Sequence, residues 1–164
     1  MSSIVDPIID AMPQIEEAQN IVMNNLKFRG KSLCEWEKFL EFPPIHPAMS
    51  VTEINKFNLR YIEVNDHIMS NYAIAKASCG VSAATYQSTL KTKQNELIET
   101  IKNDPNNKRM PGMDSIEKLA ALSCANEYHA WKVNEMHVDF WKTYHDKMYL
   151  LDSRLSNLSY TLRN

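Results

Sequence analysis

Three histidines lie eight residues apart late in the chain, at His129, His137 and His145. Eight residues turn an α-helix about 80° out of register, so the three rings do not converge on one metal ion. The sequence also has no HExxH or CxxC motif, no Gly-x-Ser-x-Gly turn, no phosphate-binding loop and no GxGxxG motif. We therefore predict no catalytic residue, no metal, no cofactor and no enzymatic activity.

Cationic residues near aromatic rings are the other candidates for a functional site. Lys27, Arg29 and Lys31 flank Phe28 within five residues. A second basic group lies further along the chain and comprises Lys91, Lys93, Lys102, Lys108 and Arg109. Basic grooves with stacking rings bind single-stranded nucleic acid. The alternative for each group is a solvated helix end whose cations face the negative end of the helix dipole.

The bulk composition describes a globular protein without strong charge. Hydrophobic residues make up 44% of the chain, charged residues 23%, and the net charge is −2. A dedicated duplex-DNA binder is usually basic, so any nucleic-acid role needs a local patch. Cys34, Cys79 and Cys124 are widely spaced and odd in number, which favours free thiols in a reducing compartment. With no long apolar run and no basic-then-apolar N-terminus, we expect a cytoplasmic protein that makes no membrane contact.

Residues 1–48 are expected to hold two short helices and a proline-rich connector. The first helix begins near Asp10 and stops at Gly30, and the second begins at the capping-box spacing of Ser32 and Glu35. With only three glycines in the chain, β-hairpins are not expected. The prolines at residues 43–47 suit a stiff connector better than a polyproline ligand for a partner.

Residues 49–164 are expected to form a long antiparallel helical hairpin. Ser50 and Glu53 repeat the capping-box spacing and start a long apolar pattern, in which Gly80 is a possible kink. A loop near 103–113 follows, and Asp114 is then expected to cap a helix that has no Pro or Gly up to Asn164. The sequence therefore predicts an all-α, coiled-coil-like fold in a single domain.

The clearest pattern lies in the last helix. Its large apolar residues from Trp141 to Leu162 step by 3, 4, 3, 4, 3 and 4, which is the heptad spacing of a packed helical seam. Upstream, either Asn134 continues this seam or the seam shifts to Val133 and Met136. The predicted packing and oligomerisation seam comprises Trp131, Val138, Trp141, Tyr144, Met148, Leu151, Leu155, Leu158 and Leu162. Because such long seams seldom stay exposed, we expect a homo-oligomer.

The layout of residues 60–164 resembles the UvsY-type recombination mediator proteins of tailed bacteriophages. Three features carry the resemblance: the stretch Leu90-Lys91-Thr92-Lys93, the loop and restart at Asp114, and the run from Val133 to Trp141. The resemblance implies an oligomeric helical hairpin that binds single-stranded DNA and assists a recombinase, with Lys91 and Lys93 as DNA contacts. The remaining DNA candidates, Lys27, Arg29, Lys31, Lys108 and Arg109, come from composition alone.

Three functions fit these expectations. The first is a phage-type accessory protein that binds single-stranded DNA and a recombinase in the host cytoplasm. The second is a structural or scaffold protein of a phage assembly. The third is a small regulator or inhibitor that binds a host protein through the hairpin.

Overall fold

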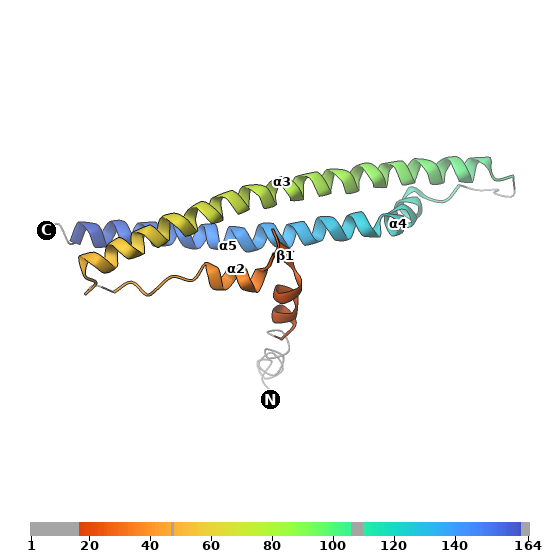
Figure 1. Ribbon diagram of the computed structural model, residues 1–164. Helices are drawn as coiled ribbons and strands as arrows, with labels where there is room; N and C mark the ends of the chain where they lie inside the picture. Colours follow the sequence, from red (N-terminus) through yellow and green to blue (C-terminus); the bar gives the residue numbers. More distant parts are fainter. Residues whose placement is uncertain (1–16, 47, 106–109, 162–164) are drawn as a thin grey trace, which may run out of the picture. The chain divides into compact units, whose positions relative to one another are not determined.

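The computed structural model describes residues 17–46, 48–105 and 110–161, with side chains as far as residue 156. Figure 1 shows that nearly all of this chain is helical, with one small hairpin of two strands. Residues 17–25 are helical and are followed by β1 (Lys27–Phe28), β2 (Lys31–Ser32) and α2 (Leu33–Phe39). The long helix α3 (Val51–Asn103), α4 (Met113–Ser123) and α5 (Ala125–Thr161) complete the fold. The all-α fold with a long helical hairpin is confirmed.

The chain divides into two compact units, and each is described separately. Unit 1 extends to Asp66 and includes the chain from Met148 onward, and unit 2 is His67–Lys147. Both α3 and α5 therefore contribute one part to each unit. The N-terminal elements belong to unit 1 and α4 belongs to unit 2.

A tight β-hairpin occupies the position where the sequence predicted only a helix end. β1 and β2 are antiparallel, with Lys27 opposite Ser32 and Phe28 opposite Lys31. The turn residues Arg29 and Gly30 have φ values of 49° and 85°, the left-handed pair that a two-residue hairpin turn requires. The helix before it ends at Asn25, so Gly30 is a turn residue and the expectation of no hairpin was wrong.

The capping box predicted for α2 is present. The Ser32 side chain accepts from the Glu35 amide at 3.1 Å, and the Ser32 amide donates to the Glu35 carboxylate at 2.7 Å. The Ser32 amide is also the main reason that the pKa of Glu35 is lowered. This cap satisfies backbone groups that a helix of only seven residues leaves unpaired in its first turn.

The core of unit 1 joins the hairpin, α2 and the start of α3. The Trp36 indole donates a buried 2.8 Å hydrogen bond to the Phe28 carbonyl, which fixes β1 against α2. Phe57 on α3 is buried and its ring lies 5.6 Å from the ring of Phe42. Arg60 on α3 donates to the Phe39 carbonyl. These contacts bury apolar surface at the N-terminal end of α3.

The long helix α3 starts at its predicted cap and is continuous through Gly80. The Ser50 amide donates to Glu53 at 2.7 Å and the Glu53 amide to Ser50 at 3.3 Å. Gly80 lies in mid-helix, and a Cβ built there meets no atom within 4 Å. The sequence left open whether Gly80 breaks the helix, and the structure shows that it does not.

The helix predicted from Asp114 onward is divided at Cys124. The chain forms α4 and α5 instead, and the Cys124 amide bonds the Ala121 carbonyl, three residues back, at 3.1 Å. Cys124 is fully buried, as are Ile116 and Ala120 on α4. We attribute the break to this packing, which outweighs the absence of Pro and Gly. Gly112, not Asp114, is the N-cap of α4.

Within unit 2, α3 packs antiparallel against α5. The ring of Tyr86 stacks on that of Trp131 with centroids 5.6 Å apart, whereas Tyr72, nearer the start of α3, meets His145, nearer the end of α5. Ile68 and Ala75 are buried on α3, and Trp141 is buried on α5. Each helix in this pair buries one side.

We predict that Gly80→Ala stabilises the isolated chain. Alanine removes the entropy cost of a glycine inside a helix, which is about 0.5–1 kcal/mol, and no atom of the chain obstructs the added methyl. Thermal unfolding by circular dichroism at the lowest usable protein concentration measures the change. A lower midpoint for Gly80→Ala than for the unchanged chain would contradict this account of Gly80.

Candidate functional site

The three basic residues predicted near the N-terminus lie together on the hairpin of unit 1. Lys27, Arg29 and Lys31 are exposed at its strands and turn. Lys31 also lies over two rings, with its Nζ 4.8 Å from the Trp36 centroid and 5.0 Å from the Phe39 centroid. Lys27 and Lys31 both lower the pKa of Glu35, so this carboxylate offsets part of their charge.

The basic residues of α3 do not form one surface. Lys91 and Lys93 are two residues apart on a helix, which is a rotation of about 200° around its axis. Their side chains therefore point to nearly opposite sides of α3. Lys93 forms a 2.7 Å ion pair with Glu96, and this hydrogen bond raises the pKa of the Lys93 ammonium. Lys91 is exposed. Lys108 and Arg109 lie outside the described residues.

The predicted seam residues of α5 follow the side that faces α3. In unit 2, Trp141 is fully buried and Trp131, Val138 and Tyr144 are half-buried. In unit 1, Met148 is buried and Leu151 and Leu155 are half-buried. Leu158 lies in α5 beyond the last described side chain, and Leu162 lies outside the described residues.

Asn134, which one of the two upstream alternatives places on the seam, contacts α3, although Val133 of the other alternative is half-buried as well. The Asn134 amide donates to the Ser82 hydroxyl of α3 at 3.1 Å, whereas the Met136 side chain is 42% exposed. Ser82 in turn donates to the Ser78 carbonyl at 3.0 Å. A polar contact between two helices fixes how one slides past the other, because a shifted pairing loses the hydrogen bond.

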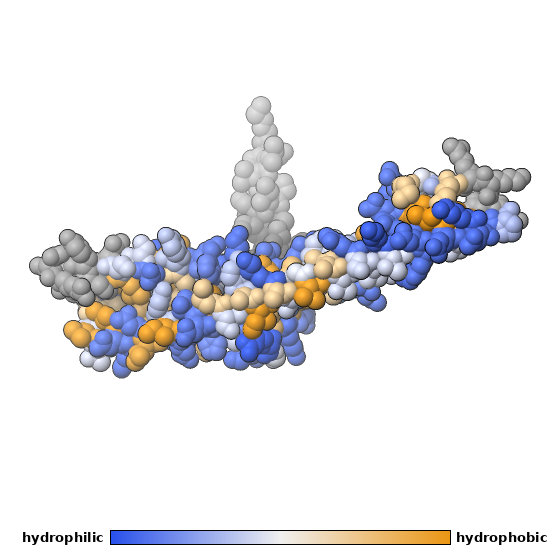
Figure 2. All heavy atoms as spheres, turned by 90° about the horizontal axis from the view of Figure 1, so that it is seen from above, coloured by the Kyte–Doolittle hydropathy of each residue, from blue (hydrophilic) through white to orange (hydrophobic). Residues whose placement is uncertain are grey.

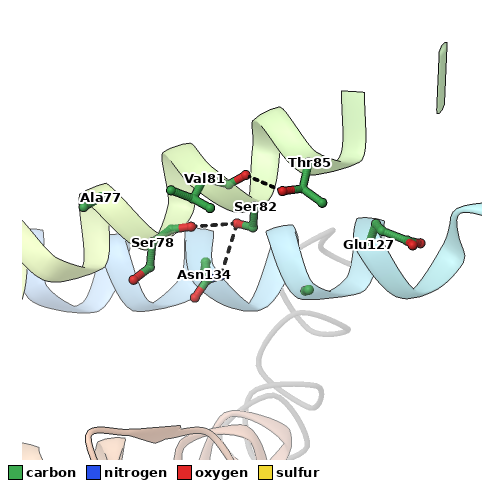
Figure 3. Close-up of a pocket in the computed structure, with 8 residues that line it drawn as sticks. Ala77, Ser78, Val81, Ser82, Thr85, Glu127 and Asn134 are labelled. Atoms are coloured by element: carbon green, nitrogen blue, oxygen red, sulfur yellow. Dashed lines mark hydrogen bonds between the residues drawn. The ribbon is translucent and has the colours of Figure 1, made fainter. Parts of the chain in front are cut away.

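A groove of about 490 Å³ opens beside this polar contact in unit 2 (Figure 3). Five residues of α3 and three of α5 line it, most of them small: Ala77, Ser78, Val81, Ser82, Thr85, Glu127, Ala130 and Asn134. Ser82 and Thr85 each donate to a backbone carbonyl of their own helix. The protons of both hydroxyls are therefore held by the backbone of α3.

An aromatic cluster near the start of α5 was missed by the sequence reasoning. Tyr128 lies 5.4 Å from Tyr86 and 5.9 Å from Trp131, measured between ring centroids. The Lys132 ammonium lies 4.4 Å from the Trp131 ring, and its ion pair with Glu135 raises the Lys132 pKa. The sequence feature that could have revealed this cluster is a spacing: Trp131 and Lys132 follow Tyr128 by three and four residues, which places all three on one side of a helix.

Two buried polar residues on the facing sides of α3 and α5 were also missed. Asn71 is fully buried and His137 is 6% exposed. His137 directly precedes the predicted seam residue Val138, and this position was the one sequence feature that could have indicated its burial. Burial lowers the pKa of the His137 imidazole below its ordinary value of 6.5, because the charged ring loses hydration.

Within the ranges that the structure describes, no three His, Cys, Asp or Glu residues are grouped closely enough to hold a metal ion. No helix in these ranges combines the length and the apolar character needed to cross a membrane. Comparisons with protein-family models, with curated proteins and with solved structures found no match.

We predict that acidification destabilises the protein partly through His137. Its pKa is lowered in the fold, so the unfolded chain binds the proton more readily, and stability falls as the pH drops below about 6.5. Between pH 7.5 and pH 5.5, the thermal unfolding midpoint should therefore fall less for His137→Gln than for the unchanged chain. The exposed His129 provides the control, because His129→Gln should keep the full decrease. Equal decreases in all three proteins would contradict the prediction.

Proposed function

We propose that this chain is a non-enzymatic helical accessory protein that assembles with copies of itself and with a protein partner. The observation that carries the proposal is the exposure of large apolar side chains on the side of α3 that faces away from α5. Leu59 is 70% and Ile62 58% exposed in unit 1, and Met69 is 50% exposed in unit 2. Figure 2 shows apolar surface running along this side of the helix.

Exposure of this kind supports binding because it is costly to leave uncovered. Single exposed apolar residues are normal, but an apolar stripe along one helix usually marks a contact with another chain. Burying such side chains stabilises a complex by roughly 25 cal/mol for each Å² removed from water. The absence of catalytic motifs from the sequence supports a role in binding rather than in chemistry.

Single-stranded DNA is the second candidate partner, and the exposed basic hairpin favours it. Lys27, Arg29 and Lys31 project from one turn and its two strands in unit 1. This arrangement is compatible with phosphate contacts, and the resemblance to UvsY-type mediators points to the same ligand and to a recombinase. A scaffold of a phage assembly and a regulator of a host protein are the alternatives in which the helices contact protein alone.

Self-association is tested by the mass of the chain in solution. We expect light scattering to give a mass above the 19.0 kDa of one chain, and this mass should increase with protein concentration. Adding a short oligonucleotide in a second run separates assembly from DNA binding. A mass of one chain at every concentration, with and without the oligonucleotide, would rule out self-association.

DNA binding is tested by its dependence on salt. We expect a labelled oligo(dT) to bind at low salt, and Lys27→Gln with Arg29→Asn to make the log–log salt dependence shallower by about one unit for each lost phosphate contact. Asparagine is chosen at position 29 because it tolerates the positive φ there. Lys91→Ala with Lys93→Ala tests the contacts suggested by the resemblance.

The control for these variants is Lys142→Gln, which removes an exposed cation from α5 and should leave the salt dependence unchanged. Fluorescence anisotropy measures all four proteins. If no oligonucleotide binds at low salt, the DNA proposal fails and assembly with protein alone remains the proposed function.

A further inference from the structure

The groove of Figure 3 lies wholly within unit 2 and carries polar groups at both of its ends. Ser78 and Asn134 lie near one end, and Thr85 and Glu127 lie near the other. Asn134 and Glu127 are seven residues apart on α5, which is about 10 Å along a helix axis. A ligand that contacts both of them must therefore be long.

The walls between these polar groups are aliphatic. Ala77 of α3 and Ala130 of α5 are exposed, and Val81 of α3 is 68% exposed. The volume of about 490 Å³ falls within the range of sites that hold small molecules. Methyl groups gain from contact with a hydrocarbon chain, because both surfaces leave water.

The hydrogen bonds around Ser82 decide which atoms the groove offers to a ligand. The Ser82 hydroxyl donates its proton to the Ser78 carbonyl at 3.0 Å, so its oxygen is left as an acceptor. The Asn134 amide must therefore turn its NH₂ group toward Ser82, at 3.1 Å, and its Oδ1 faces away from Ser82. The Thr85 proton is likewise held, by the Val81 carbonyl at 2.9 Å.

The groups left for a ligand are acceptors, and one of them is charged. Among the described residues, no hydrogen bond or ion pair uses the Asn134 Oδ1 or the Glu127 carboxylate. The pKa of Lys93 is raised mainly by its hydrogen bond with Glu96 and only slightly by Glu127, so Lys93 is not the ion-pair partner of Glu127. Glu127 lies in the first turn of α5, where the helix dipole favours its ionised form.

We propose that this groove binds a linear aliphatic polyamine. One ammonium group donates to the Glu127 carboxylate and another to the Asn134 Oδ1, and the methylene chain between them lies against Ala77, Val81 and Ala130. An ammonium group that meets a carboxylate forms the stronger, charge-assisted kind of hydrogen bond. A polyamine fits better than a lysine side chain of a partner protein, because a single ammonium group reaches one of the two acceptors and not both. This inference does not depend on the function proposed above.

Binding is tested by isothermal titration calorimetry of the full chain at low salt, with spermidine as the probe. We expect one spermidine to bind per chain. Hexane-1,6-diol has an aliphatic chain without charge and should give no heat of binding. The blocked lysine derivative Nα-acetyl-lysine methylamide has one ammonium group and should bind at least about tenfold more weakly than spermidine.

Two variants assign the binding to the groove. Glu127→Gln keeps the shape of the side chain but removes its charge, and should raise the dissociation constant of spermidine about tenfold. Ala130→Leu fills the groove from an exposed position of α5 and should abolish binding without changing the helicity measured by circular dichroism. The control Glu117→Gln removes an exposed carboxylate from α4 and should leave the dissociation constant within about twofold.

Several results would overturn the proposal: no binding of spermidine at low salt, an equal loss in Glu117→Gln and Glu127→Gln, or unchanged binding by Ala130→Leu. The lysine derivative provides a further check. If it binds as tightly as spermidine, the groove holds a basic side chain of a partner protein and the polyamine assignment is wrong. Self-association is measured separately, by the mass of the chain in solution, and none of these results changes that test.

Discussion

Two long helices that pack side by side can bury only the side of each that faces the other, and this constraint governs the structure. In unit 2, Trp141 of α5 and Ile68 and Ala75 of α3 are buried in this way. The Asn134–Ser82 hydrogen bond adds a position-specific contact between the two helices. Among the described residues of unit 2, the other side of α3 is exposed, and it is therefore the surface available to a partner.

In unit 1, elements before α3 in the chain cover part of the start of α3. There the Trp36 indole joins α2 to the hairpin, while Phe42 contacts Phe57 of α3 and Arg60 of α3 donates to the last residue of α2. This cover needs several specific contacts because the elements are short: the strands have two residues each and α2 has seven. A helix of that length is marginal alone, so its cap and the indole hydrogen bond matter more than its propensity.

The sequence predicted those features that a local pattern specifies. The heptad positions of α5 whose side chains the structure describes are buried or half-buried, and the Ser–Glu pairs at residues 32 and 50 located two helix starts. The hairpin was missed because Gly30 serves a helix end and a turn equally well, and the hydrogen bond from the Trp36 indole to the Phe28 carbonyl is a contact that no local pattern reveals. The break at Cys124 was missed because it depends on the burial of Ile116 and Ala120, which no local signal reveals.

For the candidate sites, sequence position was a poorer guide than it was for the fold. Lys91 and Lys93 are neighbours in sequence, yet the helix directs them apart and Glu96 holds one of them in an ion pair. The hairpin has the opposite effect, because its turn brings Lys27 and Lys31 close enough for both to act on Glu35. A basic run on a helix is therefore spread over different sides, whereas a basic run across a tight turn is concentrated. This difference makes the hairpin the better candidate for an anionic ligand.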